Sequence, residues 1–329
     1  MQPYRGAGGD GRQRLRRRVG RCGADARRGR GRRPRRLRRA PPARAGARPE
    51  GAAAVPRVRG DIVDLDTLER TIDEHGITQV IHLAALQVPF CRADPALGAR
   101  VTVVGTVNVF EAVARRRDRK RHLVYASSIA AYDPDGRPDG HPSTIYGAFK
   151  RANEATAHVY ELEHGLASIG LRPHTVFGPG RDRGVTSAPT AAMLAAAAGR
   201  RYHIPYGGRA QMQYTLDVAQ AFIAAARVDA AGASVHNLAG DVAGMDEIVA
   251  AIEVAAPEAA GLITYDDTPL AFPSQVDAAS FSALGPAPET PLAEAIADTV
   301  ARFRVLLAGG LVTPPAEAAT APFASPAPE

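Results

Sequence analysis

The sequence has few cysteines, no tryptophan and no long apolar run. Its two cysteines, Cys22 and Cys91, are too few for a disulfide framework and lack the spacing of metal ligands. We therefore expect no metal site and a reduced, cytoplasmic location. No run of about 18 apolar residues occurs, and no charged segment followed by an apolar one opens the chain. These absences predict a protein without a membrane span or a secretory signal.

Lysine is also nearly absent, because Lys120 and Lys150 are the only lysines among 41 basic residues. Residues 1–50 contain eighteen arginines and three acidic residues, which is a net charge of +15. Residues 51–329 contain 23 basic and 31 acidic residues, which is a net charge of −8. The overall charge of +7 therefore averages two unlike segments and does not by itself indicate a nucleic-acid-binding protein.

Residues 1–50 have neither a helical nor an alternating apolar period, so we expect a disordered leader that buries no face. As a basic arm it would bind phosphates, which allows a nucleic-acid-binding protein with an inactive Rossmann-like domain. A transit peptide is disfavoured because the segment contains no serine. We favour a third interpretation, translation out of frame. Arginine codons of the CGN type encode Gly, Ala, Val or Asp when they are read one nucleotide later, and the gene sequence tests this.

From about residue 55 onward, short apolar runs alternate with helical patterns, which is typical of a parallel βαβ sheet. We expect α/β class, with a Rossmann-like doubly wound parallel sheet and a smaller C-terminal substrate lobe. Strands are predicted within residues 54–61, 78–85, 121–128, 167–180 and 234–240, and helices within 64–76, 102–117, 143–164, 188–200, 215–227 and 246–256. The expected parts are the leader 1–50, a core 51–175, a lobe 176–312 with returning core elements, and a disordered tail 313–329.

One predicted helix places a tyrosine and a lysine on the same face, because Tyr146 and Lys150 are four residues apart. A phenol has a pKa of about 10 and is a poor base at neutral pH, but a cation within about 4–6 Å favours the phenolate. Lysine is a compact charge with three donors, so it can face a phenol and a sugar hydroxyl together, which the flat fork of arginine cannot. The pair also fits an amphipathic helix with a packed tyrosine and a solvated lysine.

Polar or small residues follow three of the predicted strands, namely Asp61, Ala84 with Ala85, and Ser127 with Ser128. The carboxyl ends of parallel strands meet at one edge of the sheet, and open α/β sheets bind their ligands outside that edge. We therefore expect a ligand site there.

Six segments stand in the order and spacing of the extended short-chain dehydrogenase/reductase family. They are GDIVD (60–64), VIHLAA (80–85), VVGTVNVFEA (103–112), VYASSIAAY (124–132), YGAFK (146–150) and LRPHTVFGPG (171–180). Together they resemble the NAD-dependent epimerase/dehydratase branch of that family over roughly residues 55–240. The resemblance implies NAD as the cofactor, with NADP not excluded, and makes residues 51–175 the NAD-binding core.

The resemblance also assigns roles to single residues. It implies that Tyr146 is the catalytic base, that Lys150 lowers its pKa and binds the nicotinamide ribose, and that Ser128 donates to the substrate oxygen. It implies cofactor contacts from Asp61, Ile62, Leu83, Ala84, Ala85, Pro173 and Val176, besides Tyr146 and Lys150. It implies substrate contacts from Ser127 (the alternative donor), Thr175, Arg181 and Arg209, the arginines being natural partners of a diphosphate.

Three departures from the family pattern stand out. The glycine-rich loop that holds the pyrophosphate at a helix N-terminus is missing, and so is the acidic residue for the adenine ribose about 20 residues later. Thr102 and Thr175 stand where the family frequently has asparagine. We therefore expect the chain as written to bind NAD weakly, and a sheet without its first one or two strands.

The resemblance implies an epimerase/dehydratase-type oxidoreductase that acts on a hydroxyl of a sugar or nucleotide sugar. A dehydrogenase of a simple hydroxy acid, a polyol or a steroid-like alcohol is an alternative on the same fold, and the basic-arm protein is an alternative from another class. The expected partner is a small-molecule substrate rather than nucleic acid or a membrane. A homodimer through the helices at 96–117 and 143–164 is also expected.

Overall fold

The computed structural model describes residues 55–116, 122–137 and 139–315, all of which belong to one unit of the chain, residues 45–329. The predicted leader at 1–50 and residues 316–329 of the predicted tail lie outside the described residues.

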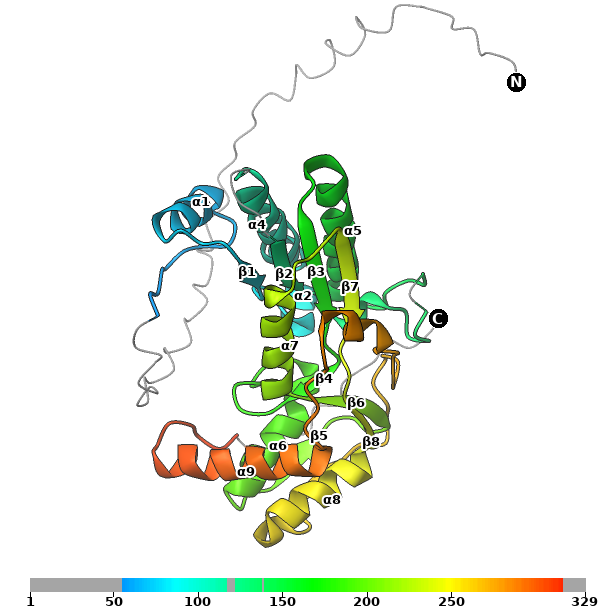
Figure 1. Ribbon diagram of the computed structural model, residues 1–329. Coiled ribbons are helices and arrows are strands. Elements are labelled where there is room, and N and C mark those ends of the chain that lie inside the picture. Colours follow the sequence, from blue (N-terminus) through cyan, green and yellow to red (C-terminus); the bar gives the residue numbers. More distant parts are fainter. Residues whose placement is uncertain (1–54, 117–121, 138, 316–329) are drawn as a thin grey trace, which may run out of the picture. The chain divides into compact units, whose positions relative to one another are not determined.

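Four parallel strands form the main sheet (Figure 1). They are β1 (Val80–His82), β2 (His122–Ala126), β3 (Ala167–Arg172) and β7 (Ala233–Asn237), in that spatial order. Val124 pairs with Ile169, and Ile169 pairs with Ser234, so the register is continuous across the inner strands. The predicted α/β class with a parallel sheet is confirmed.

Helices cover both faces of this sheet. Successive side chains of a strand point to opposite faces, so neighbouring residues of one strand pack with different helices. Leu123 and Tyr125 pack with α1 (Leu65–Glu74), α4 (Gly105–Ala114) and α5 (Ile145–His164) in one cluster of buried apolar side chains. Val124 lies between them in sequence but packs with α7 (Thr215–Arg227) in a separate cluster. Figure 1 shows α7 on one face of the sheet and α4 and α5 on the other. The sheet is therefore doubly wound, as predicted.

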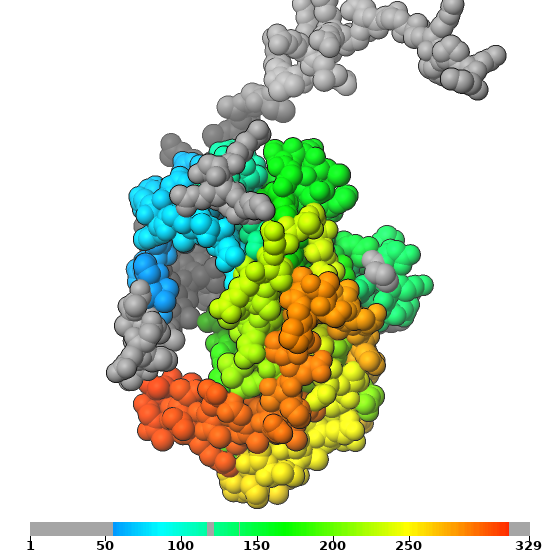
Figure 2. All heavy atoms as spheres, viewed as in Figure 1, coloured from blue at the N-terminus to red at the C-terminus, as the bar shows by residue number. Residues whose placement is uncertain are grey.

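The C-terminal lobe has its own small sheets and its own core. One sheet has the order β4 (Thr175–Phe177), β6 (Arg209–Tyr214), β8 (Asp241–Gly244), and the other pairs β5 (Tyr202–Ile204) with β9 (Ile263–Tyr265). The lobe helices are α6 (Ala188–Ala197), α8 (Met245–Ala255) and α9 (Leu292–Ala308). Their apolar sides share one buried cluster, and Figure 2 shows α9 (orange to red) lying against α8 (yellow).

The helix predicted at 102–117 begins earlier. It follows α2 (Val88–Ala93) and runs from Pro95 through α3 (Pro95–Ala99), a π-helical turn (Arg100–Val104) and α4. Within the described residues, Pro95–Ala114 alone is long and apolar enough to cross a membrane, by length and composition. This is weak support for a span, because core helices of soluble proteins meet the same criteria. Nearly half of the helix is buried, and Asn153 of α5 donates to its Thr102 carbonyl and to the Thr106 hydroxyl.

The prediction of a strand at 54–61 is wrong for its described part, because residues 55–61 form no strand. A strand needs a hydrogen-bonding neighbour, and none of the described strands lies beside this segment. The predicted buried strand at 78–85 is also shorter and less enclosed than expected. It spans only Val80–His82 at the described edge of the sheet, where Ile81 is 39% exposed and the following Leu83 is 60% exposed.

Candidate active site

Helix α5 positions the tyrosine and the lysine at the carboxyl edge of the sheet. It begins after Thr144, which caps the helix because its side chain accepts a hydrogen bond from the Gly147 backbone at 3.0 Å. Gly147 also permits close packing, because a Cβ there would lie 2.0 Å from the carbonyl oxygen of Ala130. The start of α5 is thereby held against the loop that follows β2, and this loop carries the two serines.

The ammonium of Lys150 is enclosed beneath Tyr146. Lys150 is only 4% exposed, its Nζ donates to the carbonyl oxygen of Ala126 at 2.6 Å, and it lies 5.6 Å from the centre of the Tyr146 ring. Burial lowers the pKa of Lys150 to about 8, because an ammonium is poorly stabilised away from water. The interpretation of Lys150 as a solvated surface residue is therefore wrong.

Ser128 and Arg181 both act on the Tyr146 phenol. Burial raises the pKa of Tyr146, while a hydrogen bond with Ser128 and the charge of Arg181 act in the opposite direction. The hydroxyl of Ser128 also accepts a bond from the Ala130 backbone at 3.2 Å, which fixes its side chain at the start of a short helical turn. The structure thus brings Tyr146, Lys150 and Ser128 together.

Ser127 has a different environment from its neighbour. Its hydroxyl donates to the carboxylate of Glu154, and that carboxylate forms a 2.7 Å ion pair with Arg172. The Arg172 guanidinium lies 4.7 Å from the centre of the Tyr132 ring. Ser127 is therefore tied into a partly buried ion-pair network that sequence reasoning missed, because nothing in the local pattern indicates that the Glu154 side chain is only 9% exposed.

A cavity of about 580 Å³ opens above these residues, between the sheet and the lobe. Nine of the fourteen site residues expected from the sequence line this cavity. The predicted site residues that line it are Tyr146, Lys150, Ser127, Ser128, Leu83, Ala85, Pro173, Val176 and Arg181. Further lining residues without a sequence signal include Gln87, His174 and Thr186.

Asp61, Ile62 and Ala84 do not line this cavity. Asp61 is exposed before α1, where its side chain accepts from the Val63 backbone. Ile62 packs on α4, because a Cβ on Gly105 would lie 2.7 Å from its side chain, and its carbonyl accepts from Asn108. Ala84 is exposed. These residues stay candidates for the adenine end of the cofactor only.

Arg209 and Thr175 are also outside the cavity. Arg209 is exposed, pairs with Glu247 at 3.4 Å and donates to the carbonyl oxygen of Val242, so the structure does not bring it to the cavity of Tyr146. It stands at the start of β6 and belongs to the outer surface of the lobe. Thr175 is buried in β4, where its hydroxyl lies 3.2 Å from the Nδ1 atom of His174.

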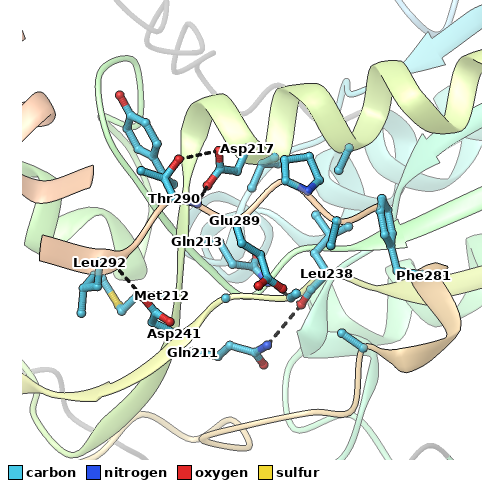
Figure 3. A pocket seen from close by; sticks show the side chains of 18 of the residues that line it. Gln211, Met212, Gln213, Asp217, Leu238, Asp241, Phe281, Glu289, Thr290 and Leu292 are labelled. Atoms are coloured by element: carbon cyan, nitrogen blue, oxygen red, sulfur yellow. Dashed lines mark hydrogen bonds between the residues drawn. The ribbon is translucent and has the colours of Figure 1, made fainter. Parts of the chain in front are cut away.

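A second hollow lies on the lobe side of β6 and has a different character (Figure 3). It is about 260 Å³ in volume, and its wall includes the carboxylates of Asp217, Asp241 and Glu289. The Asp217 carboxylate accepts from the backbone and the hydroxyl of Thr290, and Asp241 accepts from the backbone of Leu292. Within the described residues, no group of three or more His, Cys, Asp or Glu side chains is placed to hold a metal ion.

A doubly wound sheet whose strand ends meet a Tyr-x-x-x-Lys pair and a serine defines a short-chain dehydrogenase/reductase of the extended type. Residues 19–239 match the model of the NAD-dependent epimerase/dehydratase family, and the chain belongs to this family. The family is one of NAD-dependent enzymes, so the expected cofactor and enzyme class are confirmed at the level of the family.

Individual relatives match over shorter stretches of sequence. The UDP-glucuronate 4-epimerase 2 of Arabidopsis thaliana is 35% identical over 130 residues, which are 37% of this chain and 30% of the plant protein. An uncharacterised 37.6 kDa protein of Escherichia coli is 34% identical over 148 residues, which are 42% of this chain and 43% of that protein. The matched part of the chain therefore spans less than half the length of these curated relatives.

Solved structures match over most of the chain. The UDP-glucose 4-epimerase of Thermus thermophilus in complex with NAD has a TM-score of 0.66 at 26% identity, covering 78% of this chain and 86% of that one. A partial-consensus L-threonine 3-dehydrogenase has a TM-score of 0.68 at 24% identity, covering 76% and 88%. At this identity the second likeness shows the fold alone.

Proposed function

We propose that the protein uses NAD to oxidise or transiently oxidise a secondary hydroxyl of a sugar or nucleotide sugar. The main support for the proposal is that Tyr146, Lys150 and Ser128 line the wall of one cavity beside the sheet. Family membership and the nucleotide-sugar epimerases among the relatives support the same chemistry.

Each of the three side chains has a distinct part in this proposal. Tyr146 as a phenolate takes the proton of the substrate hydroxyl, and Ser128 donates a hydrogen bond to the same oxygen. The Lys150 ammonium stabilises the phenolate. NAD, when bound, supplies the acceptor for the hydride that leaves the carbinol carbon.

The described residues fit the nicotinamide half of NAD. Leu83, Ala85, Pro173 and Val176 give the cavity a small, apolar wall next to Tyr146 and Lys150. Lys150 uses one donor on Ala126, which leaves two for a ribose hydroxyl and the phenolate. Among the described residues there is no glycine-rich loop at a helix N-terminus for the pyrophosphate.

The test is NADH formation by the full chain with NAD⁺ and a panel of sugars, nucleotide sugars, hydroxy acids and polyols, followed at 340 nm. Tyr146→Phe should abolish turnover of any substrate found and leave the melting temperature unchanged, because the ring keeps its packing. Tyr160→Phe is the matched control, since Tyr160 lies on the same helix but donates to Glu111 away from the cavity. Full activity of Tyr146→Phe would refute the assignment.

The proposal includes a homodimer through the helical stretch Pro95–Ala114 and α5. Both carry exposed apolar side chains within the described residues, among them Val104, Val159 and Leu162, and Leu162 is 68% exposed. Two such faces, paired across a twofold axis, would bury this apolar surface. Sedimentation should give twice the chain mass, and Leu162→Glu should shift it to the monomer. A monomeric parent protein would refute the dimer.

A cytoplasmic location completes the proposal. It is supported by the buried free thiol of Cys91, which fits a reducing compartment. Fractionation of expressing cells should place the protein with soluble cytoplasmic markers, and recovery with membranes would refute this part.

A further inference from the structure

Arg181 is a cation on the cavity wall without an anion of its own. Its terminal nitrogen donates to the hydroxyl of Thr186 at 2.8 Å, while its Nε atom is enclosed and has no hydrogen-bond partner. Within the described residues, no carboxylate forms an ion pair with it, and the neighbouring Asp182 lies 4.0 Å from Arg183 instead. Enclosing a guanidinium without a counter-charge is costly, so this arrangement favours an anionic ligand.

Arg181 lies close to the reacting position. Its charge counteracts part of the rise that burial causes in the pKa of the Tyr146 phenol, and both side chains line the same cavity. Gln87 stands beside it with an enclosed Oε1 atom that accepts no bond. Both side chains pack against Gly184, since a Cβ there would lie 2.0 Å from Gln87 Oε1 and 3.4 Å from the Arg181 terminal nitrogen. Next to Tyr146, the cavity wall therefore offers the Arg181 guanidinium as a hydrogen-bond donor and the Gln87 Oε1 atom as an acceptor for a hydroxyl.

The charges around the cavity favour a single carboxylate over a diphosphate. Lys150 is committed beneath Tyr146, and burial lowers the pKa of His174, which leaves that ring neutral while its Nε2 bonds to the Pro273 carbonyl at 2.6 Å. Arg181 is therefore the one described cation of the lining that is available to an anion. Its planar fork matches a carboxylate with two parallel hydrogen bonds.

Neither Arg209 nor the second hollow offers a diphosphate a binding place beside the cavity. Arg209, the other expected phosphate ligand, is paired with Glu247 on the outer surface. The hollow beyond β6 exposes Asp241 and Glu289 on its wall, and their charges repel phosphate (Figure 3).

We propose that Arg181 binds the carboxylate of a free sugar acid or a similar polyhydroxy acid, and that this acid rather than a nucleotide sugar is the substrate. The inference rests on the proposed function, because Tyr146 must hold the hydroxyl that reacts. In the reaction the carbinol becomes a carbonyl, its C–H hydride reduces NAD⁺ to NADH, and its O–H proton passes to the Tyr146 phenolate. Gln87 accepts a hydrogen bond from another hydroxyl of the acid.

Binding and turnover test this separately in the full chain. Calorimetry with D-glucuronate, D-galacturonate and D-gluconate, without and with NAD⁺, should detect binding of at least one acid. D-glucose and UDP-glucose should bind at least about tenfold more weakly, since each leaves the guanidinium without a carboxylate. Arg181→Met should weaken acid binding about 100-fold, and Arg181→Lys should recover only part of the loss because it keeps the charge without the fork.

Arg304→Met is the matched control, because Arg304 is exposed on α9 and paired with Glu258. Melting curves show whether each variant is folded. If Arg181→Met does not fold, the comparison of acid binding uses Arg181→Lys instead. Equal binding of acids and neutral sugars, or acid binding that survives in Arg181→Met, would overturn the inference. So would NADH formation from UDP-glucose faster than from every acid. Acid binding that is lost in Arg181→Met, without NADH from any alcohol, would refute the proposed function and with it the acid as substrate, and would leave Arg181 as a carboxylate-binding residue only.

Discussion

The Nζ atom of Lys150 lies 5.6 Å from the centre of the Tyr146 ring and donates to the carbonyl of Ala126. Enclosure raises the pKa of the phenol and lowers that of the ammonium, so neither charge is stable alone. In the proposed mechanism a phenolate at Tyr146 is stabilised by the ammonium of Lys150. This role would account for a lysine at this position in an otherwise arginine-rich chain.

Replacing this lysine with arginine should not preserve activity. In Lys150→Arg the charge is kept, but the larger guanidinium cannot fit the enclosed site at Ala126 and face both the phenolate and a ribose hydroxyl. We expect kcat to fall by about 100-fold or more. Lys150→Met should be inactive and should also weaken NAD binding, because the ribose loses a donor. Initial rates and NADH titrations measure both, and an active Lys150→Arg would contradict the role given to Lys150.

The buried ammonium should make stability depend on pH. The pKa of Lys150 is about 8 in the folded protein against 10.5 for an ordinary lysine, so between these values the unfolded chain binds more protons. Stability should therefore rise as the pH increases from 8 towards 10, by about 1.4 kcal/mol per pH unit. Urea unfolding at pH 7, 8, 9 and 9.5 measures this rise. The difference between the parent and Lys150→Met isolates it, and a parallel pH profile for the two proteins would contradict the buried charge.

The helix that carries the site was predictable because its signals are local. A cap at Thr144, a glycine at Gly165 with a φ of 63°, and the four-residue spacing of Tyr146 and Lys150 all act within one helix. The resemblance then supplied the cavity residues Leu83, Ala85, Pro173 and Val176. These predictions depended on neighbouring residues, or on motifs whose spacing is fixed by the fold.

The failures involve long-range contacts. The apolar pattern at 54–61 is that of a strand, yet a strand also needs a neighbour, which no described strand provides. Arg209 has a plausible position in sequence, but its place at the outer end of β6 directs it to Glu247. Gln87 and Glu154 carry no local signal, since only tertiary packing encloses a single polar side chain.

The two adjacent serines should separate into one that affects rate and one that affects stability. Ser128→Ala removes a donor beside Tyr146 and should lower kcat by about 100-fold with little change in unfolding. Ser127→Ala removes a bond to the partly buried Glu154–Arg172 pair and should cost about 1 kcal/mol of stability with a much smaller effect on kcat. Steady-state kinetics and urea unfolding of both variants provide the comparison. The reverse pattern would make Ser127 the donor to the substrate.

The last prediction concerns the adenylate half of NAD. The cavity fits the nicotinamide end, whereas the described residues include no glycine-rich loop for the pyrophosphate, and β1 leaves Ile81 and Leu83 exposed at the sheet edge. Without that loop the full chain should bind NAD⁺ only weakly, with a Kd above about 100 μM. Nicotinamide mononucleotide, which lacks the adenylate, is the matched ligand. Calorimetry should show NAD⁺ binding no more than about tenfold tighter than the mononucleotide, which is 1.4 kcal/mol or less. A micromolar Kd for NAD⁺ together with a far weaker mononucleotide would show that residues outside the described part of the chain hold the pyrophosphate, and would also contradict the out-of-frame interpretation of residues 1–50.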